Sequence, residues 1–126
     1  MKKTFISEQA KEFRTKYNLR SSPTKDKRTY QKNLIGEEFK EFLEADGFLF
    51  RHGQNFQEDC LKELADLVYV CYQYAENMGW LLDEALDRVH KSNMSKLGED
   101  GKPIYREDGK VLKGPNYKPP NLEDLV

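Results

Sequence analysis

The sequence predicts an all-α protein, with a four-helix core and a short C-terminal tail that includes a hairpin. Apolar residues recur at intervals of three and four in four segments, which is the period of an amphipathic helix. Polar stretches, glycines and a proline separate these segments, and the period is lost from Gly98 onward. Because the chain has only 126 residues, we expect one domain spanning 1–126, with a helical core at about 7–97 and a tail at 98–126.

The four helices are expected at about residues 7–18, 27 or 28 to 45, 56–78 and 82–97. Ser7 is suited to cap the first helix, and a polar loop containing Pro23 separates it from the second. The third helix has the clearest apolar stripe, made by Leu61, Leu64, Ala65, Val68, Cys71, Tyr72 and Ala75. Gly79 follows that stripe, as a glycine at a helix C-terminus does.

Glycine also marks two other expected boundaries. Asp46-Gly47 is expected to end the second helix, which leaves the apolar segment 48–54 as a packed loop. In the tail, Asp108-Gly109 lies between two short apolar runs and indicates a two-residue hairpin turn. Regular structure is not expected beyond it, because of Pro115, Pro119 and Pro120.

The charge pattern argues against binding to a nucleic-acid polymer or a membrane. The net charge is −1, from 21 Lys and Arg against 22 Asp and Glu, so no basic excess is available for a phosphate backbone. No apolar run approaches the length that spans a bilayer. The charges are nevertheless uneven: basic residues outnumber acidic ones in residues 11–32, and acids outnumber basic residues from Glu37 to Asp66. A polyanion held on a metal ion needs both kinds of charge in one pocket.

The two cysteines predict a reducing, cytoplasmic location. Cys60 and Cys71 are eleven residues apart, which is roughly 16 Å along one helix. That separation is too long for a disulfide, so we expect both to be free thiols. The N-terminus also lacks the apolar stretch of a secretory signal.

Two pairs of acids carry the chemical signal. Glu38 and Glu41 are three residues apart on the second expected helix, and Glu63 and Asp66 are three apart on the third. Residues at this spacing share a helix face, so two antiparallel helices can bring all four carboxylates to one point. Four such groups cannot all stay ionised in one pocket without a cation. Oxygen-only ligands suit Mg²⁺, or Mn²⁺, and disfavour zinc.

The alternative for these acids is a solvated helix face, which is the usual role of carboxylates three apart. A solvated helix face is a sufficient explanation for Glu38 and Glu41 when this pair is considered alone. It is weaker for Asp66, because every other residue from Leu64 to Val70 is apolar and buried acids are rare unless paired or bound to metal. The occurrence of both pairs therefore favours a metal site.

The acid pattern resembles the signature of the all-α nucleotide pyrophosphohydrolases, the superfamily of MazG, the dimeric dUTPases and phosphoribosyl-ATP pyrophosphohydrolase. In this chain it reads Glu-x-x-Glu at 38–41, a gap of 21 residues, then Glu-x-x-Asp at 63–66. The segment from Val89 to Lys96 is similar to the fourth-helix motif of the MazG-like, or phosphoribosyl-ATP pyrophosphohydrolase-like, subgroup. Residues 109–115 and 117–120 look like the tail of that subgroup.

The resemblance implies a hydrolase that splits nucleoside triphosphates into a nucleoside monophosphate and pyrophosphate. It also implies a homodimer or homotetramer, and it makes the four acids the Mg²⁺ ligands. Glu37 is a candidate to orient or deprotonate the attacking water, with an exposed helix-face acid as the equal alternative. Other activities remain open: phosphoribosyl-ATP hydrolysis uses the same acids, and a regulatory module would bind nucleotides without turnover.

The resemblance also supplies candidate contacts to the substrate. They are basic or amide side chains in the fourth helix and basic or aromatic ones in the tail: Lys91, Asn93, Lys96, Lys113 and Tyr117. Lysines of this kind are point-charge partners for phosphate, and an asparagine can hydrogen-bond a sugar or base. The alternatives are a wet helix end, where lysines meet the helix dipole, and a tail that only packs.

Overall fold

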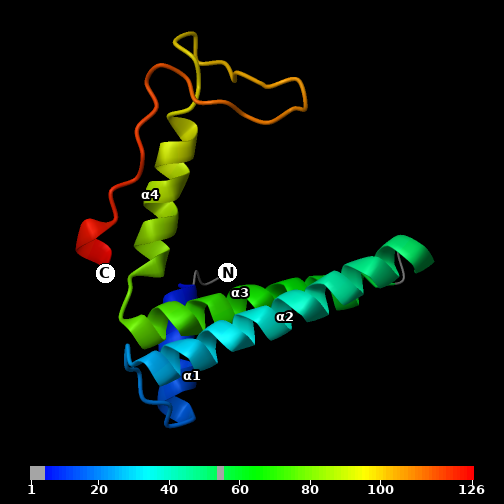
Figure 1. Ribbon diagram of the computed structural model, residues 1–126, viewed down its shortest axis with the longest axis vertical. Coiled ribbons are helices and arrows are strands. Elements are labelled where there is room, and N and C mark those ends of the chain that lie inside the picture. The colour runs from blue at the N-terminus through cyan, green and yellow to red at the C-terminus, as the bar shows by residue number, and fades with distance from the viewer. Residues whose placement is uncertain (1–4, 54–55) are drawn as a thin grey trace. The chain divides into compact units, whose positions relative to one another are not determined.

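The computed structural model describes residues 5–53 and 56–126. Within those residues lie four α-helices, α1 (Ile6–Lys16), α2 (Lys25–His52), α3 (Gln57–Met78) and α4 (Leu82–Met94), and a final 3-10 turn, η2 (Glu123–Leu125) (Figure 1). The described part of the chain contains no strand, only one isolated antiparallel bridge. The all-α class and the four predicted helices are therefore confirmed.

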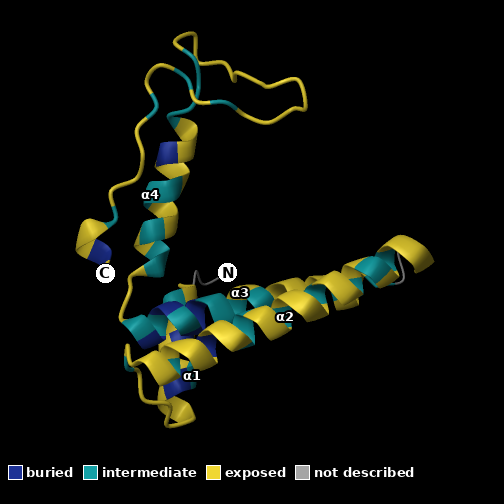
Figure 2. Cartoon of the chain, in the orientation of Figure 1, coloured by how far each residue is buried: buried dark blue, intermediate teal, exposed yellow. Residues whose placement is uncertain are grey.

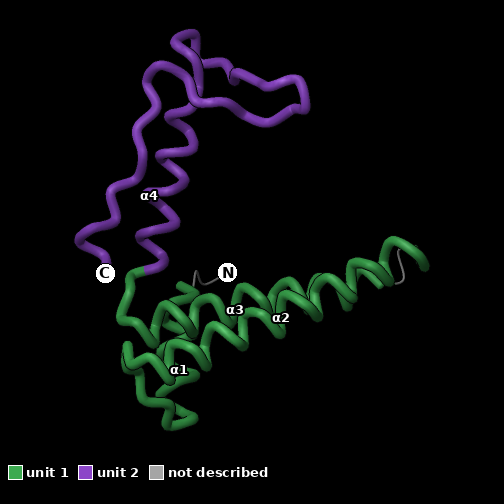
Figure 3. Tube along the Cα trace, viewed as in Figure 1, with its two compact units in different colours: residues 1–81 green, residues 82–126 purple. Residues whose placement is uncertain are grey.

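The chain divides into two compact units, one up to residue 81 and one from residue 82 to the C-terminus (Figure 3). In the first unit, α2 and α3 run antiparallel side by side, and α1 contacts α3 (Figure 1). The antiparallel pairing of the second and third helices, on which the metal prediction depends, is thus present.

Polar side chains make up much of the buried centre of the first unit. Its buried apolar residues are Ala10, Tyr72 and Ala75, whereas its buried polar residues are Arg14, Gln31, Gln73 and Asn77. They gather where α1 meets the α2–α3 pair (Figure 2). The chain therefore contains buried polar groups that must be hydrogen-bonded or otherwise compensated.

The prediction that Asp46-Gly47 ends the second helix is wrong, because α2 continues to His52. A glycine inside a helix costs only about 1 kcal/mol relative to alanine, so tertiary contacts can override it. Here the ring of Phe48 stacks on His52 at 5.7 Å and on Phe56 at 5.9 Å. The segment expected as a loop is therefore helical through His52, and its last residue, Gln54, lies outside the described residues.

Other boundaries differ by a few residues. Ser7 lies inside the first turn of α1 rather than capping it, since Phe5 is the N-cap. Gly79 ends α3 with φ +75°, as predicted. Helix α4 ends at Met94 instead of 97, because the returning tail binds this end: Gly114 N donates to the carbonyl of Lys96 at 2.8 Å.

The tail forms a hairpin-like turn, but its loop is longer than predicted. Tyr105 and Val111 make the isolated bridge, and Arg106 N donates to the carbonyl of Lys110 at 2.8 Å. Three residues rather than two connect these partners, and Gly109, the last of the three, takes φ +88°. This is the geometry of a three-residue loop with glycine in the left-handed region.

The rest of the tail returns along α4 within the second unit. Ser92 Oγ donates to the carbonyl of Lys118 at 2.7 Å, and Arg88 donates to both carboxylate oxygens of Asp124, at 2.6 and 3.0 Å. Leu125, in η2, is buried. In α3, Cys60 and Cys71 are free thiols, as expected from their spacing.

Candidate functional site

Three of the predicted metal ligands meet across the α2–α3 pair. Glu38 and Glu41 project from α2 and Glu63 from α3, and each offers a carboxylate oxygen within 4.8 Å of the oxygens of the other two. We call these three residues the acid cluster. It forms because residues three apart share a helix face and the two helices run antiparallel.

The acid cluster is electrostatically unfavourable without a cation. Burial, and after it the charge and hydrogen bond of Glu41, raise the pKa of Glu38, and the charges of Asp66 and Glu63 raise it further. One oxygen of Glu38 and one of Glu63 are buried and have no hydrogen-bond partner. Such orphaned acceptors are costly unless a donor or a cation reaches them.

Asp66, the fourth predicted ligand, is occupied by a lysine that sequence reasoning missed. Lys62 Nζ lies 2.7 Å from a carboxylate oxygen of Asp66 and 3.5 Å from one of Glu63. These contacts, Asp66 first, raise the pKa of Lys62. The Lys62 side chain is 66% exposed, so the ammonium can move into solvent without breaking the core. The sequence does contain a signal for this ion pair, because Lys62 and Asp66 are four residues apart and so share a helix face.

The donor chemistry fits a hard divalent cation. All ligand atoms on offer are carboxylate oxygens, and no cysteine or histidine belongs to the group found among the described residues. Two of the oxygens are buried and unsatisfied, which a bound cation corrects. Asp66 is closer to solvent than its apolar run suggested, with 38% of its side chain exposed, and Leu64 and Val68 of the same run are exposed as well.

A cavity of about 360 Å³ opens beside the acid cluster. Glu41 and Glu63 belong to its lining, and Phe48 and Phe56 supply aromatic walls. Both aromatic residues belong to the segment between the two acid pairs: Phe48 lies in α2, and Phe56 directly precedes α3. Glu37 is exposed on α2 next to the cluster, so its placement is compatible with either of its proposed roles.

The five predicted substrate contacts all lie in the second unit. Lys91 pairs with Asp87 at 2.9 Å, and Asn93 is exposed on α4. In the tail, Lys113 Nζ lies 4.8 Å above the ring centre of Tyr117. Lys96 is half-buried near the end of α4. Their role toward a nucleotide therefore stays a prediction.

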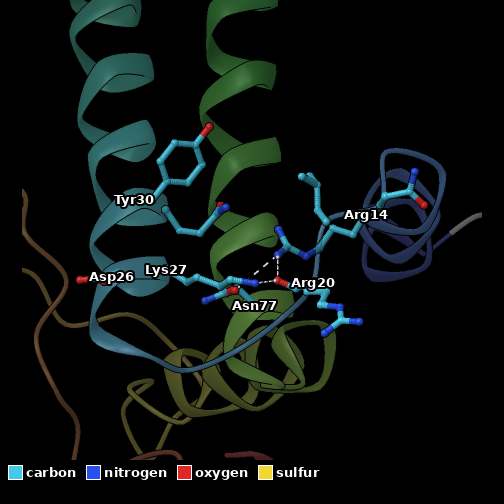
Figure 4. Close-up of a pocket in the computed structure, with 9 residues that line it drawn as sticks. Arg14, Arg20, Asp26, Lys27, Tyr30 and Asn77 are labelled. Atoms are coloured by element: carbon cyan, nitrogen blue, oxygen red, sulfur yellow. Dashed lines mark hydrogen bonds between the residues drawn. The ribbon is translucent and has the colours of Figure 1, made fainter.

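A second cavity, of about 530 Å³, lies in the first unit and was not predicted (Figure 4). It is formed where the end of α1, the segment after it, the start of α2 and the end of α3 come together. The lining includes three basic residues, Arg14, Arg20 and Lys27, and one acid, Asp26. The sequence predicts a polar loop around Pro23 and does not indicate a cavity there.

The chain matches a known protein family over most of its length. The family model described as phosphoribosyl-ATP pyrophosphohydrolase matches residues 1–93, which include all the predicted acidic residues and most of α4. No curated protein matches the chain. In the part of the chain that the structure describes, no helix is both long enough and apolar enough to span a bilayer.

Proposed function

Because the chain belongs to the phosphoribosyl-ATP pyrophosphohydrolase family, within the MazG-like superfamily, and is thus a nucleotide pyrophosphohydrolase, we propose that it cleaves a nucleoside triphosphate between the α and β phosphates. The proposed cofactor is Mg²⁺, or Mn²⁺. The products are a nucleoside monophosphate and pyrophosphate. The proposed metal ligands are Glu38, Glu41, Glu63 and Asp66.

The observation that carries the proposal is the acid cluster with its two orphaned oxygens. Carboxylate oxygens within 4.8 Å of one another, two of them buried without a partner, are suited to a cation that also takes phosphate oxygens. When bound, Mg²⁺ would neutralise charge on the triphosphate and polarise the phosphoryl group. Asp66 would be free to act as a ligand once the exposed Lys62 ammonium had moved into solvent.

The chain's own residues then position the reactants. Glu41 and Glu63 face both the cluster and the adjacent cavity, so a triphosphate in that cavity lies beside the ligands. Glu37 orients or deprotonates the attacking water, and the alternative is an exposed acid without a role. The contacts to sugar, base and phosphates are proposed for Lys91, Asn93, Lys96, Lys113 and Tyr117.

Two substrate classes are supported by different observations. The resemblance to the wider superfamily favours nucleoside triphosphates, especially deoxynucleoside triphosphates or non-canonical ones. The family match favours phosphoribosyl-ATP, because that is the substrate named in the family's description. A non-catalytic nucleotide sensor has no supporting observation, since the chain retains the acids and belongs to a family of enzymes.

We also propose a cytoplasmic homodimer or homotetramer. Apolar side chains on α2 and α3 are exposed in the single chain, among them Phe39, Leu43, Leu61 and Val68. Phe39 and Leu43 share a face of α2, and Leu61 and Val68 share a face of α3, by their spacing of four and seven residues. Exposed apolar faces of this kind are typical of a protein interface. Sedimentation velocity at several protein concentrations measures the assembly directly, and a monomer at all of them contradicts this part of the proposal.

The decisive experiment measures pyrophosphate release from canonical and modified NTPs and dNTPs and from phosphoribosyl-ATP. Each substrate is tested with Mg²⁺, with Mn²⁺ and with EDTA. We expect pyrophosphate release to depend on the metal and to fall by at least 100-fold in Glu41→Gln and in Asp66→Asn. A loss of this size is typical when a group that stabilises charge in the transition state is removed. Glu12→Gln, on the exposed face of α1, is the matched control. Release of orthophosphate, or turnover in EDTA, contradicts the proposal.

A further inference from the structure

The cavity beside the acid cluster continues along α2 and α3, away from the metal ligands. On α2 its lining passes from Glu41 to Phe48, and on antiparallel α3 it passes back from Glu63 to Phe56, the residue before the helix. Each step is seven residues, which is roughly 10 Å along a helix axis. The cavity therefore has one end at the acid cluster and another at the two phenylalanines, which we call the aromatic end.

The wall of the aromatic end is ordered by contacts within the chain. The rings of Phe48 and Phe56 lie 5.9 Å apart with their planes inclined by 27°, and His52 packs against them at 5.7 and 5.5 Å. The guanidinium of Arg51 lies 5.4 Å from the centre of the Phe48 ring. Phe48 is nevertheless 47% exposed, so part of its surface is open to a ligand. An aromatic wall of this kind suits a planar ring such as a nucleobase.

The polar groups at the aromatic end are hydrogen-bond acceptors. Glu44 lies four residues before Phe48 and Asp59 lies three residues after Phe56, and both acids line the cavity. Within residues 5–53 and 56–126, no basic side chain lies within ion-pair distance of either carboxylate. An ionised carboxylate accepts hydrogen bonds and donates none. A ring that meets this end must therefore present N–H groups to it.

The pattern of donors distinguishes the nucleobases. Guanine presents two adjacent donors, N1–H and the 2-amino group, which can donate together to the two oxygens of one carboxylate. In adenine and cytosine the amino group is next to an unprotonated ring nitrogen, and in uracil and thymine the one N–H lies between two carbonyls. The lone pairs of these neighbouring acceptors would face the carboxylate and repel it.

We propose that the aromatic end binds a guanine base, so that guanine nucleoside triphosphates are the preferred substrates. The base lies against Phe48 and Phe56, and its N1–H and 2-amino group donate to a carboxylate of the pair Glu44 and Asp59. The preference rests on the proposed function, which puts the triphosphate at the acid cluster. Adenine lacks the second donor, so a guanine nucleotide is favoured over the adenine nucleotide that the family's description names.

The substrate test compares dGTP with dITP, which differ only in the 2-amino group. With Mg²⁺ present, we expect kcat/KM for pyrophosphate release to be at least tenfold higher for dGTP, because a bidentate contact to a base discriminates by roughly this factor. The values for dATP and dCTP should be at least tenfold below that for dGTP. Equal values for dGTP and dITP, or a higher value for dATP or dCTP, overturn the guanine contact.

A pair of matched double variants tests the two acids. Glu44→Gln, Asp59→Asn keeps the side-chain sizes and gives each group an NH₂ donor, so the preference for dGTP over dITP should fall from at least tenfold to less than threefold. Asp46→Asn, Glu58→Gln makes the same two changes, one in each helix, at exposed positions outside the cavity lining. It should leave the preference unchanged. An unchanged preference in the first variant, or equal loss in both, overturns the assignment.

A binding test in EDTA separates this inference from the proposed function, because it needs neither metal nor turnover. 2′-Deoxyguanosine is added to the unmodified full chain, and its amide NMR signals are followed. We expect the backbone amides of residues 44–48 and 56–59 to shift, and 2′-deoxyinosine to bind at least fivefold more weakly. Absence of these shifts, or equal affinity for both nucleosides, overturns the guanine site. Shifts without pyrophosphate release from any triphosphate contradict the proposed function and leave the guanine site standing.

Discussion

Glu38→Gln should stabilise the metal-free protein while removing its response to Mg²⁺. The substitution keeps the size of the side chain, removes one negative charge from the acid cluster and supplies an amide donor to its neighbours. Glu38 is the residue whose pKa is raised by burial and by Glu41, Asp66 and Glu63, so its ionised form opposes folding when no cation is bound. Neutralising it removes that cost.

The size of the effect follows from the separations in the cluster. Two like charges about 4.8 Å apart repel by about 3.5 kcal/mol at an effective dielectric constant of about 20. Glu41 is exposed, so solvent screening reduces this figure severalfold. We therefore expect a net gain of about 1 kcal/mol, or a rise of about 4 °C in Tm.

The assay is thermal unfolding at pH 7 and one protein concentration, with EDTA or with excess Mg²⁺. Saturating a site to 100 times its Kd stabilises the unmodified chain by about 2.7 kcal/mol, and Glu38→Gln should lose most of this gain. Glu37→Gln makes the same charge change one residue away at an exposed position, and should show neither effect. A lower Tm for Glu38→Gln in EDTA, or an undiminished Mg²⁺ response, refutes the electrostatic reasoning.

Three further changes test other parts of the structure. Lys62→Gln should lower Tm in EDTA and increase the stabilisation by Mg²⁺ in the same assay, because the ammonium no longer pairs with Asp66. Unchanged stabilisation by Mg²⁺ counts against competition between Lys62 and the metal ion for Asp66. Gly114→Ala should release the tail from the end of α4, since a Cβ at this position would overlap the backbone after α4. Faster amide hydrogen exchange at residues 115–126 would show the release, and unchanged protection of these amides contradicts it. Arg88 lowers the pKa of Asp124, so this contact stabilises the folded tail at neutral pH and is lost as the pH falls through the lowered pKa. Asp124→Asn should abolish that pH dependence of tail exchange, and a dependence that survives contradicts the assignment.

The acid cluster was predictable because it depends on local spacing. Two acids three residues apart share a face whatever the tertiary structure, and one assumption, antiparallel helices, brings Glu38, Glu41 and Glu63 together. The same kind of spacing also contained Lys62 and Asp66. Spacing alone does not show whether an acid on such a face pairs with a lysine, as Asp66 does with Lys62, or faces the other acids.

The second cavity was not predictable in the same way. It depends on polar residues that are buried, such as Arg14 and Asn77, and a sequence pattern assigns residues of these types to the surface. Their burial becomes intelligible only when partners far along the chain are known: Arg14 hydrogen-bonds Gln73, which is 59 residues away. Non-local pairing of this kind leaves no periodic trace in the sequence.

Gly47 shows the same limit for the fold, and it provides a test. Gly47 predicted the wrong end for α2, because stacking of Phe48 on His52 and Phe56 favours a continued helix.

Since α2 continues through this position, Gly47 only weakens the helix there. Gly47→Ala should then stabilise the protein by about 0.5–1 kcal/mol in urea unfolding. Space is available, since a Cβ there would meet only the end of the Arg51 side chain, at 3.5 Å. Gly53→Ala is the control: its φ is +80°, so the same substitution should destabilise. A loss of stability in Gly47→Ala would mean that this segment needs the conformational freedom of glycine, and that α2 does not run unbroken to His52.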